Sequence, residues 1–146
     1  MRFVVPTSIA LLLLYLVWGT GIHGDDYPLM QHAQSVGLWG YLLPNPSEIS
    51  VLVFGPGSYY LQYFSFYVFG SQYLLGYDII KFLVSGAAIW LTYRFAVDFL
   101  PRKRAALASI LFVLVVTHDA TLYWFGTLMY VLAPALIMYA HHLIRH

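Results

Sequence analysis

Long apolar stretches separated by short polar segments run along most of this chain. The first covers residues 3–22, and three more cover 79–100, 105–118 and 121–140. A helix needs about 20 mainly apolar residues to cross the hydrocarbon core of a bilayer. The pattern therefore predicts an all-α integral membrane fold, with about four transmembrane helices in a single membrane unit that covers 1–146.

The first apolar stretch has a second interpretation. Arg2, the leucines at 11–14 and the segment 19–21 imitate the charged, apolar and cleavage regions of a secretory signal peptide. The apolar core of a signal peptide usually has about 7–15 residues. The stretch 3–22 is longer than that, which favours an uncleaved membrane anchor.

A segment of different character, from about residue 23 to 78, separates the first two predicted spans. Apolar residues between Leu29 and Leu43 recur on one helical face, which indicates a helix lying on the membrane surface. Residues 58–69 then carry four tyrosines, and tyrosine hydroxyls favour the membrane–water interface. The pattern predicts one or two interfacial or re-entrant helices within this long loop.

The basic residues set the orientation of the predicted spans. With the N-terminus in the cytoplasm and residues 58–69 not crossing, six of the seven Lys and Arg residues lie inside and only Lys81 lies outside. Cytoplasmic loops of membrane proteins carry an excess of Lys and Arg. The loop 23–78 is therefore predicted to be extracytoplasmic, with the chain in a plasma membrane such as the bacterial inner membrane.

Composition agrees with this class and narrows the chemistry. The chain is 61% apolar and 9% charged, whereas soluble domains carry about 25% charged residues. A net charge of +1 without a basic cluster of nucleic-acid type argues against a nucleic-acid partner. The absence of cysteine excludes disulfides, thiolate metal sites and cysteine nucleophiles. No serine-nucleophile elbow, phosphate loop or dinucleotide fingerprint is present, so catalysis would depend on carboxylates.

Two pairs of neighbouring residues are candidates for that chemistry. Asp25 and Asp26 follow the first span, where one carboxylate could deprotonate an acceptor hydroxyl while the other orients it or binds a divalent cation. A helix N-cap explains one of the two equally well. His118 and Asp119 follow a short predicted span, and an acid at membrane depth requires a wet cavity lined by protein. Asp26, His118 and Asp119 are the candidate ligands of a divalent cation.

Other basic side chains are weaker candidates for ligand binding. Lys81 could hold a phosphate as a point charge, and a snorkelling lysine at a helix end is the alternative. His141, His142 and His146 have the composition of a metal-binding tract, although a juxtamembrane tail in the cytoplasm is the simpler interpretation.

Several short motifs follow one another in a recognisable order. They are Gly24-Asp25-Asp26-Tyr27 after the first span, the surface helix, Gly55-Pro56-Gly57-Ser58-Tyr59-Tyr60, Phe69-Gly70, Lys81, the basic loop at 101–108, and Asp119. This layout resembles the N-terminal part of the GT-C superfamily of integral membrane glycosyltransferases. Within it, the chain is most similar to the dolichyl- and undecaprenyl-phosphate-sugar branch, which includes protein O-mannosyltransferases and aminoarabinose transferases. Departures from the family pattern are Gly57 for a second proline, Lys81 for arginine and Asp26 for glutamate.

The resemblance implies transfer of a sugar from a polyprenyl-phosphate donor to an acceptor on the extracytoplasmic side. It implies Asp25 as the catalytic base and Asp26 as the residue that helps to position the acceptor or an ion. Lys81, Asp119, Tyr59 and Tyr60 would then bind the substrates. Members of the family have several hundred residues, so the chain is expected to be an N-terminal fragment whose partner is the rest of the same enzyme.

Two other functions remain open from the sequence. One is a small non-catalytic membrane subunit that binds a polyprenyl lipid or stabilises a larger transferase, whose activity would survive the loss of both Asp25 and Asp26. The other is a transporter, channel or metal helper that uses His23, His32 and the pair at 118–119, which would carry a bound transition metal.

Overall fold

The computed structural model describes residues 4–24, 26–42, 56–116, 125 and 128–146. The helices are α1 (Val4–Val17), α2 (Asp26–Leu42), α4 (Pro56–Phe69), α5 (Leu74–Ala96), α6 (Arg102–Val116) and α8 (Met129–Arg145). The described part of the chain contains no strand, which confirms the predicted all-α class.

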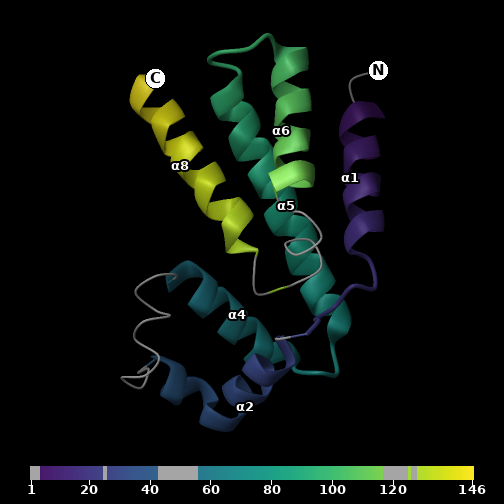
Figure 1. Cartoon of the computed structure of the whole chain (residues 1–146), viewed down its shortest axis with the longest axis vertical. Helices are drawn as coiled ribbons and strands as arrows, with labels where there is room; N and C mark the ends of the chain where they lie inside the picture. The colour runs from purple at the N-terminus through teal and green to yellow at the C-terminus, as the bar shows by residue number, and fades with distance from the viewer. Residues whose placement is uncertain (1–3, 25, 43–55, 117–124, 126–127) are drawn as a thin grey trace.

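Helix α5 is the centre of the arrangement. It packs against α8, α6, α1 and α4, and α2 packs against α4. Helices α1, α5, α6 and α8 follow the long axis of the molecule, whereas α2 and α4 gather at one end (Figure 1). The start of α1, the end of α8 and the turn between α5 and α6 lie at the opposite end (Figure 1). The two ends of the molecule are called the α2/α4 end and the α5–α6 turn end below.

Two clusters of buried side chains hold these helices together. The first lies at the α2/α4 end and includes the fully buried Phe66 and Tyr77 together with Phe125. The second joins α5, α6 and α8, where Ala88 and Ala135 are fully buried. Such small side chains let helix backbones approach closely, which is the usual basis of helix packing in membranes.

The outward faces of the long helices are apolar. Tyr15 is 80% exposed, Ile137 72% and Ile144 87%, and many other large apolar side chains share this exposure. Among the described residues, one helix, Leu74–Ala96, is long and apolar enough to cross a membrane by length and composition. In its most apolar window, 33% of the residues are buried within the protein.

The helices begin and end at different residues from the predicted spans. Helix α1 ends at Val17 rather than near 22, because the following glycines adopt backbone angles outside the helical range. Helix α5 covers Leu74–Ala96 instead of 79–100, so it starts within the segment predicted as loop. The other two also shift, to Arg102–Val116 for the predicted 105–118 and to Met129–Arg145 for 121–140.

Helices are present in both segments of the predicted outer loop, and their position relative to a membrane stays a prediction. Helix α4 covers the tyrosine-rich segment, and α2 covers the segment predicted around 29–43, with a break at Gly37 where φ is 67°. The Tyr63 hydroxyl of α4 donates a hydrogen bond to the Gly37 carbonyl at this break. Burial raises the pKa of the Tyr63 phenol above its ordinary value, and the neighbouring Tyr67 raises it further.

Candidate functional site

The loop that follows α1 is shaped by glycines. Gly19, Gly21 and Gly24 have φ values of 74°, 49° and 51°. Residues with a Cβ atom rarely adopt this left-handed region, so glycine is the residue that permits such a path. The loop consequently folds back and directs backbone N–H groups toward the first turns of α5.

Asp78 on α5 receives these backbone groups. Its Oδ2 accepts a hydrogen bond from the Gly19 N–H at 2.8 Å, and its Oδ1 accepts one from the Gly21 N–H at 2.7 Å. The Thr20 hydroxyl lies 3.2 Å from Oδ1. Asp78 is only 4% exposed, so these hydrogen bonds replace the contacts with water that its carboxylate loses on burial.

Lys81 lies one helical turn further along α5 and is fully buried. Its Nζ donates to the Thr20 Oγ1 at 2.9 Å and to the Gly21 carbonyl oxygen at 2.5 Å. Burial disfavours the positive charge of its ammonium group, and the neighbouring carboxylates of Asp78 and Asp26 favour it. Gly21 therefore contacts the acid through its N–H group and the base through its carbonyl oxygen, and the Thr20 hydroxyl lies near both.

Asp26 closes the loop at its other side. It is the first residue of α2 and 3% exposed. Its Oδ2 accepts hydrogen bonds from the His23 N–H at 3.2 Å and from the Phe125 N–H at 3.0 Å. A carboxylate at a helix N-terminus is also stabilised by the helix dipole. Asp26 thereby connects the end of the loop to a residue far away in the sequence.

An aromatic cluster lies next to these charges. Phe66 of α4, Tyr77 of α5 and Phe125 have ring centroids 5.0 to 5.9 Å apart. The Tyr77 hydroxyl donates to the Gly70 carbonyl at 2.9 Å, which satisfies its one polar group. Water has little access here, so the attraction between the neighbouring charges is weakly screened.

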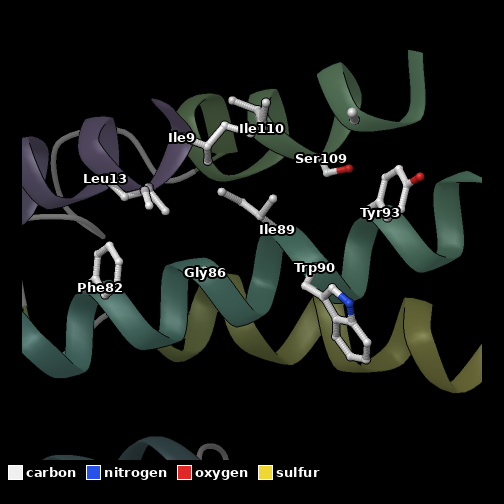
Figure 2. A pocket seen from close by; sticks show the side chains of 11 residues that line it. Ile9, Leu13, Phe82, Gly86, Ile89, Trp90, Tyr93, Ser109 and Ile110 are labelled. Atoms are coloured by element: carbon white, nitrogen blue, oxygen red, sulfur yellow. The ribbon is translucent and has the colours of Figure 1, made fainter. Parts of the chain in front are cut away.

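A groove of about 400 Å³ runs between α1, α5 and α6. Leu13 and Phe82 face each other at one end of it, and Tyr93 and Ser109 lie at the other (Figure 2). Gly86 leaves its wall open, since a Cβ atom there would meet nothing within 4 Å. The Ser109 hydroxyl bonds to the Ala105 carbonyl of its own helix. The groove is therefore an almost entirely apolar surface that begins one residue after Lys81 on α5.

No family model, curated protein or solved structure matches the chain. The chemistry of the site is accordingly derived from its own residues, contacts and burial.

The structure places part of the predicted site. Asp26 and Lys81 lie in the buried cluster described above, and Tyr60 lies on α4 with 43% of its surface exposed. Because Lys81 is fully buried beneath the loop, a phosphate reaches its ammonium group only if residues 18–24 move. Three predicted site residues and one side chain lie outside the described part of the chain: Asp25, His118, Asp119 and the side chain of Tyr59.

Asp78 is the central residue that sequence reasoning did not single out. The prediction that a span begins at 79 placed Asp78 in the loop, apart from Lys81. The informative signal was the spacing of three between an acid and a base in an otherwise apolar stretch, because residues i and i+3 share a helix face. The partners on the loop could not be predicted, since they are backbone groups that any glycine-rich loop provides.

Proposed function

We propose that this chain is the N-terminal membrane part of a glycosyltransferase that takes its sugar from a polyprenyl-phosphate donor on the extracytoplasmic side. In this proposal α1, α5, α6 and α8 cross the membrane, while α2 and α4 lie at its outer surface. The α5–α6 turn end then faces the cytoplasm.

The exposure and charge of the helices support the membrane arrangement. Large apolar side chains cover the outward faces, as expected for surfaces that contact lipid. The basic residues at 102–104 begin α6, and Arg94 and Arg145 end α5 and α8. All of them belong to the α5–α6 turn end, and an excess of basic residues is typical of the cytoplasmic side.

The observation that carries the proposal is the buried cluster of Asp26, Asp78 and Lys81. Burying charges is costly, and charges within membrane proteins usually mark functional sites. Here they fix the loop on both sides of the position that the resemblance assigns to the catalytic base, Asp25: Gly21 before it is bonded to Asp78 and Lys81, and Asp26 after it is bonded to Phe125. Catalytic groups need such fixed supports, because small displacements reduce the rate strongly.

The proposed reaction is a displacement at the anomeric carbon of the donor sugar. Asp25 takes the proton of the acceptor hydroxyl, and the acceptor oxygen forms a bond to the anomeric carbon with inversion. The bond between that carbon and the phosphate oxygen breaks, and polyprenyl phosphate leaves with the bonding electron pair. Because the leaving group is already an anion, a nearby positive charge helps it more than a proton donor does. Lys81, which is bonded to the loop residues Thr20 and Gly21, is the candidate for that charge.

The groove suits the donor's apolar tail. It extends along α5 from Phe82 to Tyr93, which is about 16 Å at a rise of 1.5 Å per residue. The residue before its first α5 member is Lys81. A polyprenyl chain in the groove would therefore have its phosphate near the α2/α4 end, where the proposed reaction takes place.

The test measures release of polyprenyl phosphate from a radiolabelled polyprenyl-phosphate sugar, a product common to all sugars and acceptors. Membranes of cells that express the intact gene are compared with membranes that carry Asp25→Asn, at equal protein level. We expect release to fall at least about 100-fold, the typical loss of a general base. Glu48→Gln, which removes another acid of the same predicted loop, should leave release unchanged. Normal release by Asp25→Asn would remove Asp25 from the mechanism.

A second function has an observation in its favour. Asp26 accepts bonds from the backbone N–H groups of His23 and Phe125, and Lys81 donates to Thr20 and to the Gly21 carbonyl, as expected of a cluster with a structural role. A non-catalytic subunit that binds a polyprenyl lipid would keep the groove and need no base. Retained transferase activity in the double variant Asp25→Asn/Asp26→Asn, together with binding of undecaprenyl phosphate by the purified chain, would favour this function over the first.

A further inference from the structure

A second group of ionisable side chains lies at the α5–α6 turn end. Asp98 follows α5, His142 lies in the last turn of α8, and His146 directly follows that helix. The His142 Nδ1 is 2.7 Å from the Asp98 Oδ2, and the His146 Nε2 is 3.1 Å from the Asp98 Oδ1. The three potential ligand atoms all lie within 4.8 Å of one another.

The packing of α5 against α8 brings these residues together. His142 and His146 are four residues apart at the end of α8, and their ring centroids are 4.8 Å apart. The contact between Trp90 and Tyr139, with ring centroids 5.4 Å apart, fixes the two helices one turn away. Asp98 is held in the turn by its backbone N–H, which donates to the Phe95 carbonyl at 3.2 Å. Two of the three donors are therefore positioned by the fold.

The three side chains differ in access to solvent. The side chains of Asp98 and His142 are each 8% exposed, whereas that of His146 is 64% exposed. A site with two sheltered ligands and one open ligand can receive an ion from solution without unfolding of the helices.

We propose that Asp98, His142 and His146 form a binding site for a divalent transition metal, with Zn²⁺ as the representative ion. Two imidazoles and one carboxylate are donors that Zn²⁺ and its neighbours in the series prefer. Three protein ligands leave a fourth tetrahedral position for water or for a group from a partner. This site lies at the opposite end from the proposed transfer site and is independent of it.

The distances between the three ligand atoms show what must change when a metal ion binds. Ligand atoms about 2.0–2.1 Å from a tetrahedral Zn²⁺ are about 3.3 Å apart. The pair of His142 and Asp98 is closer than this, at 2.7 Å, because it forms a hydrogen bond. The metal therefore replaces the proton between Nδ1 and Oδ2, and that proton leaves the site or moves to the other ring nitrogen.

Arg94 opposes this exchange. Its Nη2 lies 3.4 Å from the His142 Nε2. A guanidinium can only donate, so the neutral ring accepts at Nε2 and keeps its proton on Nδ1. A metal on Nδ1 removes the proton from that atom, and a proton moved to Nε2 would meet the N–H group of Arg94. The positive charge of Arg94 adds electrostatic repulsion, so its removal should strengthen metal binding.

The experiment titrates Co²⁺ into the full chain, purified without a polyhistidine tag, reconstituted in nanodiscs and stripped of metal. Visible absorption reports Co²⁺ coordination, and Zn²⁺ is then added to displace it. We expect one ion per chain, with binding weakened at least tenfold in His146→Ala, whose exposed side chain makes unfolding an improbable cause. His142→Ala should weaken binding further.

Two variants sharpen the test. His141→Ala is the matched control, since His141 is a neighbour on the same helix that packs on Phe95 instead of Asp98; it should bind Co²⁺ as the unmodified chain does. Arg94→Gln should bind Co²⁺ severalfold more tightly. The proposal is overturned if the unmodified chain gives no Co²⁺ spectrum, or if His141→Ala and His146→Ala weaken binding equally. Loss of sugar transfer in Asp25→Asn has no bearing on this result, so the two proposals fail separately.

Discussion

The two ends of the molecule use similar side chains in different ways. At the α2/α4 end, Asp78 is bonded mainly to backbone N–H groups and Lys81 to a backbone carbonyl and a threonine. At the α5–α6 turn end, Asp98 is bonded to two histidine side chains, one of them exposed. Backbone groups are fixed by the fold, so a charged side chain bonded to them keeps the same partners. Side chains can rotate, so a charged side chain bonded to them can release a partner and bind a ligand instead. The first arrangement suits a support, and the second suits a ligand site.

The largest expected effect of a substitution is at Asp78. Asp78→Asn leaves the charge of Lys81 without its nearest acid on α5 and replaces one acceptor oxygen by an amide that donates. Removing one partner of a buried charge pair costs about 3–5 kcal/mol. We expect a large fall in the thermal unfolding midpoint of the detergent-purified chain. Asp98→Asn, the matched change at the other end, should lower the midpoint far less. Equal losses would contradict the contrast between the two ends.

The double variant Asp78→Asn/Lys81→Met sharpens the same comparison. Methionine is apolar and of similar length, so the double variant removes the charges of Asp78 and Lys81 together, while Asp26 keeps its bonds to the N–H groups of His23 and Phe125. Removing both members of a buried pair of opposite charges is often far less costly than removing one. We expect it to be more stable than Asp78→Asn alone, by an interaction free energy of about 1–3 kcal/mol in a double-mutant cycle. Additive losses would show that Asp78 and Lys81 act separately.

Substitution of a glycine in the loop after α1 should lower the stability by a smaller amount. Gly21→Ala places a Cβ atom on a residue with φ of 49°, at 3.4 Å from the Leu74 side chain. The left-handed conformation costs about 1–2 kcal/mol for a residue with a side chain. Gly86→Ala is the control, because that helical glycine has open space around its Cβ position and alanine is favoured in helices by about 0.5–1 kcal/mol. Unfolding midpoints should fall for the first variant and rise slightly for the second.

The smallest effect concerns pH and the break in α2. The pKa of Tyr63 is raised in the folded chain, so its contribution to stability is complete below the ordinary pKa of about 10. That contribution is lost as the pH rises through the folded value. Tyr63→Phe should be about 1 kcal/mol less stable at neutral pH, because the bond to Gly37 is lost. Unfolding followed between pH 8 and 11 should show a shallower alkaline decline for Tyr63→Phe. If the stability of Tyr63→Phe declines as steeply as that of the unmodified chain, the alkaline loss of stability comes from other tyrosines.

The sequence predicted the helical class and the two helices around 29–43 and 58–69, because apolar periodicity and aromatic content are local signals. It predicted helix ends less well. The start of α5 at Leu74 depends on packing of its first turns against α4 and the loop after α1, which no local pattern records. The bonds of Asp78 to Gly19 and Gly21 join segments far apart in the sequence. The donors are backbone N–H groups, which nearly every residue has, so the residue types do not reveal them.

The cluster of Asp98, His142 and His146 could be predicted from the sequence only in part. The spacing of four between His142 and His146 predicts a shared helix face, whereas the third member, Asp98, is 44 residues before His142. Only the packing of α5 against α8 brings it close. The same holds for Asp26 and Phe125, 99 residues apart. Long-range pairing is therefore the part of each site that the sequence does not reveal.

The most direct test of the account is the sidedness of the two ends in a membrane. The chain has no cysteine, so single cysteines can be introduced at Tyr73, which is 63% exposed beside the α2/α4 end, and at Pro101 in the exposed α5–α6 turn. An impermeant maleimide should label Tyr73→Cys in intact cells, and Pro101→Cys only after the membrane is opened. Labelling of both variants from the same side would contradict the proposed arrangement and the function built on it.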